Sequence, residues 1–366
     1  MKKLAIIAIF IVALAFGGFL GFIITGFATA GTTQDSFEFY YEPSSPDPIE
    51  ELFMNVDVGG VEIQYNNSNT PYYAKIEVSI VVSGLFMAGR NYLDFFEPYT
   101  EWWDNSSDPV SFDMNVKPDV WFDPSHWFKS YNIDIKVTLR TDVIYNVFAN
   151  VATGSLKMRV PENIVLNNTV LRTSTGSVLL SSSSNTNFQG IVLVQSSTGK
   201  ANVSSKESNY AYGLVSGTST GSLILNFENC IMSNDIKGTV STGSITYNTD
   251  NLTFTKDSSI VLQTTTGSIG GVINQYEDLG ANVSAIFGVT TGGIDLVYIN
   301  DKSNIGTKFT STFTTGGINY DYSGLEFFQV DGILTSGNYN TAPYRYMFTL
   351  STVTGNINVD AESHHL

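Results

Sequence analysis

The chain has few of the residues on which most catalytic and metal sites depend. It contains one cysteine and three histidines in 366 residues. A single cysteine excludes an intramolecular disulfide and a zinc site built from several cysteines. Charged residues make up 14% of the chain, whereas about 25% is usual in soluble domains. This composition argues against an ordinary metabolic enzyme, and it predicts no cofactor.

Basic residues are also scarce. The chain has 18 Lys and Arg against 34 Asp and Glu, a net charge of −16. Because binding to phosphate backbones needs clustered Lys and Arg, nucleic acid is not an expected partner. The acidity is concentrated near the N-terminus, where residues 31–134 hold 18 acidic and 4 basic side chains. Residues 135–366 hold 16 and 12, so they are close to neutral.

The first thirty residues contain the longest apolar run. Residues 4–30 carry no charge and follow Lys2 and Lys3. A helix of this length would reach about 40 Å, more than the roughly 30 Å hydrocarbon core of a bilayer. The sequence therefore predicts a signal anchor over residues 1–30, with a cytoplasmic N-terminus and an extracellular body. The alternative is a secreted protein cleaved near Ala30, after an A-x-A site.

Export would make N-glycosylation possible. Six N-x-S/T sequons are candidate acceptors: Asn66, Asn105, Asn167, Asn202, Asn251 and Asn282.

A repeat dominates the rest of the chain. A small-hydroxyl-Gly step recurs ten times with a mean spacing near 22 residues, at Gly154, Gly176, Gly199, Gly221, Gly243, Gly267, Gly292, Gly316, Gly337 and Gly355. Apolar residues recur two and four positions after the glycine and seven positions before it, as in Ala201, Val203 and Val192. This period of two indicates strands with one buried face. Single units cannot bury that face, but stacked units can. The prediction is an all-β solenoid of about ten coils.

The residue before the glycine is Thr in nine of the ten units and Ser336 in the other. One interpretation is an outward, flat threonine array of the kind found in ice-binding solenoids. The other is a corner ladder of stacked, inward hydroxyls, with the glycine supplying the turn. Counting back by twos places the threonine on the buried face, and a bulge would then shift the phase. The spacing favours the inward ladder.

The repeats resemble a known family. Residues 159–163 (RVPEN) and 171–178 (LRTSTGSV) are similar to the entry strand and the tandem S/T-x-G-S-I/V coils of the prokaryotic putative-adhesin β-solenoid domains, a family of unknown function. Residues 56–63 (VDVGGVEI) resemble their opening strand pair. The resemblance covers about residues 52–82 and 132–360. It implies a surface β-solenoid with an adhesive or scaffolding role and no catalytic residues.

An acidic, aromatic insertion at residues 90–131 departs from that family pattern. It holds twelve aromatic residues, including all four tryptophans: Trp102, Trp103, Trp121 and Trp127. Tryptophan faces can stack on sugar rings, and the nearby Asp119 and Asp123 could accept sugar hydroxyls or bind Ca²⁺. The insertion could instead be the cap that covers the first coil. The sequence favours the cap, and it matches no metal-site template.

Three segments follow from these patterns: an anchor at 1–30, an acidic cap at 31–134 and a solenoid at 135–366. The predicted function is a structural, adhesin-like surface glycoprotein that is not an enzyme. Its expected partners are the membrane, through the N-terminal helix, and glycans or other surface proteins. One alternative is a glycan- or Ca²⁺-binding module with its site in residues 90–131. A second is a polysaccharide-active enzyme, which would need carboxylates from several coils to converge.

Overall fold

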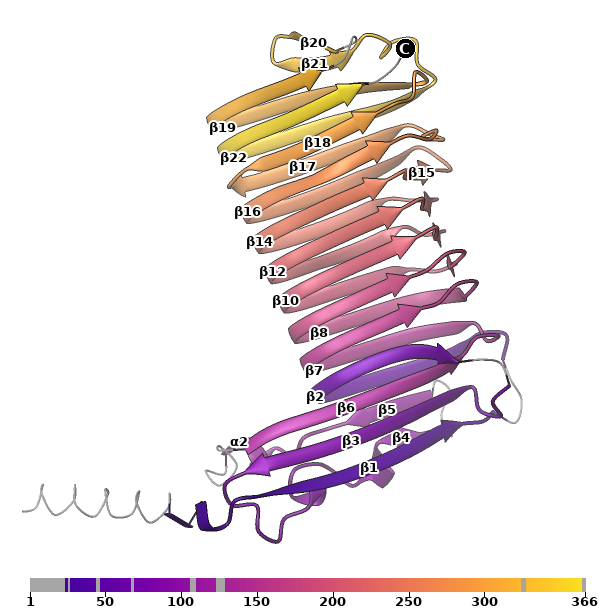
Figure 1. Ribbon diagram of the computed structural model, residues 1–366, viewed down its shortest axis with the longest axis vertical. Helices are drawn as coiled ribbons and strands as arrows, with labels where there is room; N and C mark the ends of the chain where they lie inside the picture. Colours follow the sequence, from indigo (N-terminus) through magenta and orange to yellow (C-terminus); the bar gives the residue numbers. More distant parts are fainter. Residues whose placement is uncertain are drawn as a thin grey trace, which may run out of the picture.

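The computed structural model describes residues 24–25, 27–43, 47–66, 69–105, 110–122, 129–323 and 327–363, with side chains except at 121–122. Its body is a column of stacked coils with an N-terminal cap at one end (Figure 1). Ten coils stack in parallel and in register. In spatial order their strands are β2 (Glu50–Asn66), β7 (Tyr145–Val160), β8 (Val165–Ser182), β10 (Val192–Lys206), β12 (Leu214–Glu228), β14 (Ile236–Asp250), β16 (Ser258–Gln275), the pair β17 (Val283–Thr291) and β18 (Ile294–Asn300), β22 (Tyr344–Ser363) and β19 (Ile305–Ser323). The structure therefore contains a stack of coils as predicted, but one of the ten, β2, comes from the segment predicted as the cap.

Each long strand bends at its coil glycine and continues along a second face. The coil glycines have φ between +130° and +143°, as in Gly221 at +137° and Gly243 at +136°. A left-handed backbone of this kind favours glycine, because a side chain would be strained there. A third, shorter side of the column is formed by β9 (Asn187–Phe188), β11 (Asn209–Tyr210), β13 (Ile231–Met232) and β15 (Thr253–Phe254).

The glycine stack differs from the predicted one at two places. Gly59 of β2 belongs to it, because Gly59 pairs in register with Gly154 of β7. Gly337 does not belong to it. That segment follows an antiparallel hairpin, β20 (Phe327–Val330) and β21 (Ile333–Ser336), which covers part of β19.

The coils also depart from chain order at the C-terminal end. β22, the last strand of the described chain, lies between β18 and β19 and pairs in parallel with both. Figure 1 shows this insertion near the top of the column. Phe348 of β22 stacks on Phe309 of β19 with ring centroids 4.5 Å apart. The end of the solenoid is therefore completed by a strand that returns between two earlier coils.

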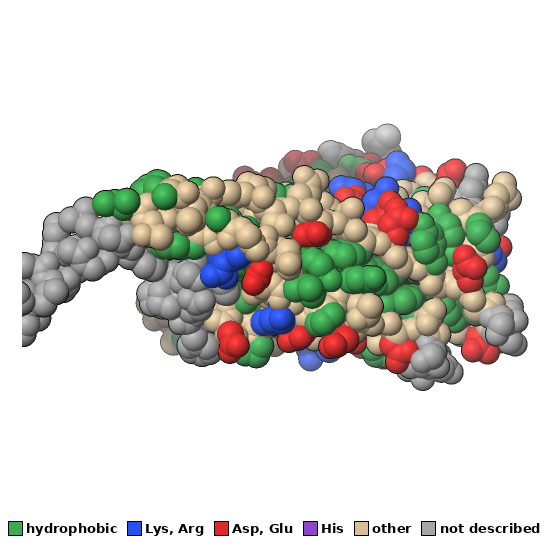
Figure 2. Space-filling view, turned by 90° about the horizontal axis from the view of Figure 1, so that it is seen from below, with side chains coloured by type: hydrophobic (Ala, Val, Ile, Leu, Met, Phe, Trp, Pro, Cys, Tyr) green, Lys and Arg blue, Asp and Glu red, His purple; other side chains and the backbone are tan. Residues whose placement is uncertain are grey.

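The cap at the other end is built from strands and short helical turns. β1 (Gly31–Tyr41), β3 (Ala74–Gly84) and β6 (Lys129–Arg140) form an antiparallel sheet, and β6 pairs with half of β2. The other half of β2 pairs with β5 (Val110–Met114), which also pairs with β4 (Trp103–Asp104). The remaining elements are the 3₁₀ turns η1 (Tyr92–Asp94) and η2 (Tyr99–Glu101) and the helix α2 (Asp119–Phe122). Seen from this end, hydrophobic side chains gather between separate acidic ones (Figure 2).

The predicted transmembrane helix and single-pass location are corrected. Among the described residues, no helix combines the length and the apolar character needed to cross a membrane. Most of the predicted span, residues 1–23 and 26, lies outside the described residues. The fold that the structure supports is all-β, with 71% of the described residues in strands.

Candidate functional site

The insertion at residues 90–131 places its first tryptophan in the core of the cap. Trp102 is 1% exposed and packs edge-to-face on Phe37, with ring centroids 5.3 Å apart. Tyr92 and Phe96 contact the same indole at 6.0 and 6.3 Å. A buried ring of this kind stabilises the cap, and it offers no face to a sugar.

The structure describes only some of the other residues predicted to bind a ligand in this insertion. Trp103 is half-buried beside Phe39, at 6.3 Å between ring centroids. Asp119 is exposed at the start of α2. The side chain of Trp121 and the whole of Asp123 and Trp127 lie outside the described residues. A ligand site in this insertion stays a prediction.

The predicted glycan acceptors fall into three groups. Asn66 and Asn105 are exposed. The side-chain nitrogens of three others already donate hydrogen bonds: Asn167 to Asn146, Asn251 to Asn229 and Asn282 to Asp257. Asn202 is partly buried. Glycosylation at all six positions stays a prediction, and the three bonded asparagines would lose a contact between coils.

A groove runs along the bend of the coils. Positions in a coil are counted here from its glycine, so that −1 is the residue before it. In β10, Val192, Val194 and Ser196 at positions −7, −5 and −3 are buried. The next two residues, Ser197 and Thr198, are both exposed. Two successive outward residues mark a β-bulge, which bends the strand.

The predicted inward threonine ladder is therefore wrong. The threonines at −1 are exposed in all nine coils that carry one there. The phase slips before this threonine, whereas the sequence interpretation placed the slip after it. Five coils instead carry an inward hydroxyl at −3, and the other five have Val or Phe at this position. Ser196 donates to the carbonyl of Gly176 at 3.0 Å, and Thr352 donates to that of Gly292 at 3.1 Å.

Two adjoining cavities of about 560 and 600 Å³ follow the outer side of this bend. They meet at Thr239 and Ser241 of β14 and together touch every coil from β2 to β19. Ten coils have nine intervals of about 4.8 Å, so the groove is about 43 Å long. The groove therefore has the shape of a track for an extended chain.

The groove is lined mainly by neutral polar side chains. The residues at −2 are hydroxyl-bearing in seven coils: Ser174, Ser197, Ser219, Ser241, Thr265, Thr290 and Thr314. In the described structure, none of these seven hydroxyls has a hydrogen bond or other polar partner within the protein. At position −4, Gln195 and Gln263 each lie beside a glycine of the next coil, Gly217 and Gly288. The seven hydroxyls at −2 and the amides of Gln195 and Gln263 are thus available to a ligand.

Charge and apolar surface are confined to particular places in the groove. Its described lining contains two charged residues, Asp57 and Arg172, both in the half nearer the cap. The outward residues at −6 form a flanking column that is apolar in the first five coils, where Phe53 and Phe148 stack with ring centroids 4.4 Å apart, and that is interrupted by Lys237 in β14. Val215, at the same position of β12, is 38% exposed.

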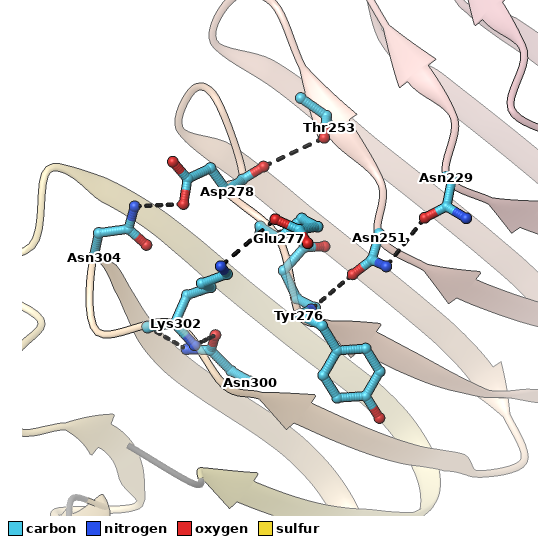
Figure 3. Close-up of polar contacts among 10 residues, drawn as sticks. Asn229, Asn251, Thr253, Tyr276, Glu277, Asp278, Asn300, Lys302 and Asn304 are labelled. Atoms are coloured by element: carbon cyan, nitrogen blue, oxygen red, sulfur yellow. Dashed lines mark hydrogen bonds and ion pairs between the residues drawn. The ribbon is translucent and has the colours of Figure 1, made fainter. Parts of the chain in front are cut away.

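The loop edge of the solenoid is a separate polar region (Figure 3). Asn251 donates to Asn229 at 3.1 Å, and Asn304 donates to the Asp278 carboxylate at 2.7 Å. Lys302 and Glu277 form an ion pair at 3.5 Å. These contacts join successive coils, so they act in the stacking of the fold. The described residues include no group of three or more His, Cys, Asp or Glu arranged to hold a metal ion.

Cys230 lies inside the solenoid, with no exposed surface. Burial raises the pKa of its thiol from 9.0 to about 11. The thiolate, which is the reactive form, is therefore disfavoured at neutral pH.

No family model and no curated protein matches the chain. Two solved structures are similar to it. One is a "putative cell adhesion protein" from Clostridium sporogenes ATCC 15579, at 9% identity and a TM-score of 0.21, covering 90% of this chain and 99% of that one. The other is a "putative adhesin" from Bacteroides fragilis NCTC 9343, at 10% identity and a TM-score of 0.31, covering 89% and 96%. These TM-scores are too low for the likeness to carry an argument about function.

The groove was not predicted from the sequence. A pattern that could have indicated it is the run of polar residues before each glycine, as in Gln195–Thr198 and Gln263–Thr266. Such runs break the alternation of a half-buried strand, and that break marks the bend.

Proposed function

We propose that the protein is an adhesin-like, non-catalytic binding protein whose groove holds a linear, hydroxyl-rich polymer, namely a polysaccharide. The observation that carries this proposal is the continuous groove across ten coils, with a column of unpartnered Ser and Thr hydroxyls along it. A hydroxyl can both donate and accept hydrogen bonds, as sugar hydroxyls do. The groove and a glycan chain are thus chemically matched along their length.

The lack of charge in most of the groove supports a neutral polar ligand. The half that extends from β14 to β19 is lined by Ser, Thr, Gln, Gly and apolar residues. Burying a neutral hydroxyl beside a hydrogen-bonding partner costs little, whereas burying an unpaired charge costs much more. The flanking apolar column adds a surface for the C–H faces of sugar rings, because aromatic and apolar side chains such as Phe53 and Phe148 pack well against them.

The periodicity of the coils favours a polymer over a single small molecule. Equivalent hydroxyls recur about every 4.8 Å along the column. Each contact would be weak, but linked contacts strengthen one another through effective concentration. Affinity is therefore expected to rise steeply with the length of the glycan and to be low for monosaccharides.

The test is to block the groove at the point where its two cavities meet. Ser241→Trp places a bulky ring in the groove, at an exposed position of β14. Thr246→Trp is the matched control, because Thr246 lies on the other face of the same strand and does not line the groove. Full-length protein and both variants would be run through native gels that contain soluble polysaccharides of several chain lengths.

The expected result is retarded migration of the unaltered protein and of Thr246→Trp in at least one polysaccharide gel. Retardation should increase with chain length and be lost in Ser241→Trp. Equal retardation of the two variants would place binding outside the groove and refute the proposal. Absence of retardation by neutral and acidic polysaccharides alike would also refute it.

A further inference from the structure

Arg172 is the single basic residue in the described lining of the groove. It occupies position −4 of β8 and is exposed. Its register partners on the neighbouring coils are Asn150 and Gln195, which also line the groove. The guanidinium is therefore set between two amide side chains, about 4.8 Å from each coil.

This guanidinium has no partner in the described structure, in contrast to two other arginines of the chain. Arg140 pairs with Asp142 at 2.6 Å, and Arg159 pairs with Glu62. No ion pair or hydrogen bond holds Arg172. An exposed arginine without a partner is common, but this one lies in a groove whose other lining residues are almost all neutral.

The carboxylate that shares the groove is placed away from Arg172. Asp57 belongs to β2, two coils from β8, at a stacking distance of about 10 Å. Its Oδ2 accepts a hydrogen bond from the backbone N–H of Val116 at 2.9 Å. Asp113, next to Asn55 of the same coil, accepts from the Asn55 amide at 2.7 Å. Both carboxylates are held by the cap side, so neither neutralises Arg172.

We infer that Arg172 is a subsite for an acidic sugar, and that the polysaccharide bound in the groove carries a carboxylate at intervals along a mostly neutral chain. This inference rests on the proposed function. A guanidinium binds a carboxylate through two parallel N–H···O bonds, and Gln195 can donate a further bond to the same group. Uronate-containing polymers have this chemistry.

The distribution of charge sets an upper limit on the acidity of the ligand. One guanidinium can pair with one carboxylate, and the chain as a whole carries a net charge of −16. A polymer with a carboxylate on every sugar would place several unpaired anions in the groove and near Asp57. Alternating acidic and neutral sugars fit this arrangement better than a polyuronate.

The test compares a polysaccharide with its own neutral form. Hyaluronan, which alternates a uronate with a neutral amino sugar, is the probe, and carboxyl-reduced hyaluronan of the same length is its neutral counterpart. Full-length protein, Arg172→Gln and Lys256→Gln would be titrated against both polymers. Lys256→Gln makes the same change of charge at an exposed loop position outside the groove. Arg172→Lys keeps the charge and removes the two-pronged geometry.

The expected result is a preference of the unaltered protein for the carboxylated polymer of about tenfold, equivalent to about 1.4 kcal/mol, because the charge-assisted bonds of Arg172 form only with the carboxylate. Arg172→Gln should lose this preference while still binding the reduced polymer, Lys256→Gln should keep it, and Arg172→Lys should fall between them. Equal binding of both polymers by the unaltered protein, or a preference that survives in Arg172→Gln, would overturn the inference and leave the proposed groove function standing. Failure to bind either polymer would overturn the inference too, and the native gels then decide the groove function separately.

Discussion

Replacing one glycine of the central stack should destabilise the solenoid strongly. Gly221 of β12 has φ +137°, and a Cβ atom added there would lie 1.7 Å from the carbonyl oxygen of Gly199 in the neighbouring coil. Ordinary contacts to a Cβ begin near 3.4 Å. Gly221→Ala must therefore both adopt a strained backbone and push two coils apart at their closest point.

The expected loss of stability is the sum of the backbone strain and the cost of separating the two coils. A non-glycine residue in a sparsely populated backbone region costs about 1–3 kcal/mol. Separating the coils weakens one or two ladder hydrogen bonds, each with a net value of about 1 kcal/mol. We expect Gly221→Ala to lower the free energy of unfolding by roughly 2–5 kcal/mol. The same change at Gly59 should cost less, because its added Cβ would approach the side chain and the carbonyl oxygen of Ile133 no closer than 3.0 Å.

The assay is urea unfolding followed by circular dichroism, with hydrogen exchange to locate the affected coils. Gly288→Ala is the matched control, since a Cβ there would meet nothing closer than 3.5 Å and its φ is not positive. That variant should be as stable as the unaltered protein. Amides of β10, β12 and β14 should lose protection in Gly221→Ala before those of β7 do, because each coil contacts only its neighbours. A stability of Gly221→Ala equal to that of Gly288→Ala would refute the reasoning.

Three further predictions concern buried side chains. Trp102→Ala should destabilise the cap by about 3–5 kcal/mol through the cavity left among its aromatic neighbours, and differential scanning calorimetry would reveal a lower first transition; an unchanged scan would contradict this packing role. Phe348→Ala should lower the stability of the C-terminal coils by a similar amount, about 3–5 kcal/mol, so hydrogen exchange should accelerate in β19 and β22 and remain slow in β8. Equal acceleration in all three strands would contradict this local role of Phe348. The pKa of Cys230 is raised on folding, so the stability that depends on its neutral thiol is complete below pH 9 and is lost as the pH rises toward about 11. Between pH 9 and about 11, the free energy of unfolding of Cys230→Ala should therefore fall less than that of the unaltered protein, as measured by urea titrations at several pH values. The same pH dependence in both proteins would contradict a raised pKa of Cys230.

The repeat and its period could be predicted because the coil glycine leaves a sequence mark every 22 residues or so. The structure shows the cause, because the coil glycines pack against one another's carbonyl groups in neighbouring coils. A Cβ atom added to Gly243, for example, would lie 1.7 Å from the carbonyl oxygen of Gly221. No other residue fits that contact. A constraint imposed in every coil yields a periodic sequence, and a periodic sequence can be recognised without a structure.

Whether the threonines at −1 point into the core or outward could not be predicted in the same way. Alternation predicts which residues are buried only while the strand remains regular, and a bulge shifts every later residue to the other face. Thr198 would be buried if the bulge followed it, and it is exposed because the bulge precedes it. Both arrangements give the same apolar columns, so the sequence could not choose between them. The candidate groove depends on this choice, and for that reason it was missed.

The position of β22 was hidden for a different reason. Its apolar columns match those of the other coils, and any coil can stack on any other if their registers agree. The insertion between β18 and β19 depends on the hairpin of β20 and β21, which has few residues and a weak pattern. Local sequence therefore shows that a coil forms, while its place in the stack depends on the long-range path of the chain.

The bend links the fold to the proposed function. Outward residues at −2 and −1 exist because the glycine forces the strand to turn, and in several coils a buried hydroxyl at −3 donates to a glycine carbonyl of the neighbouring coil, as Ser196 does to Gly176. The seven hydroxyls at −2 and the side chains of Arg172, Gln195 and Gln263 at −4 make no polar contact within the described structure, so they have no such structural role. Substitutions there can change the ligand at little cost in stability, whereas substitutions at −3 and at the glycine cannot. If the groove is the binding surface, variation of specificity should be confined to those two outward columns, where Arg172 already stands apart from its neutral neighbours.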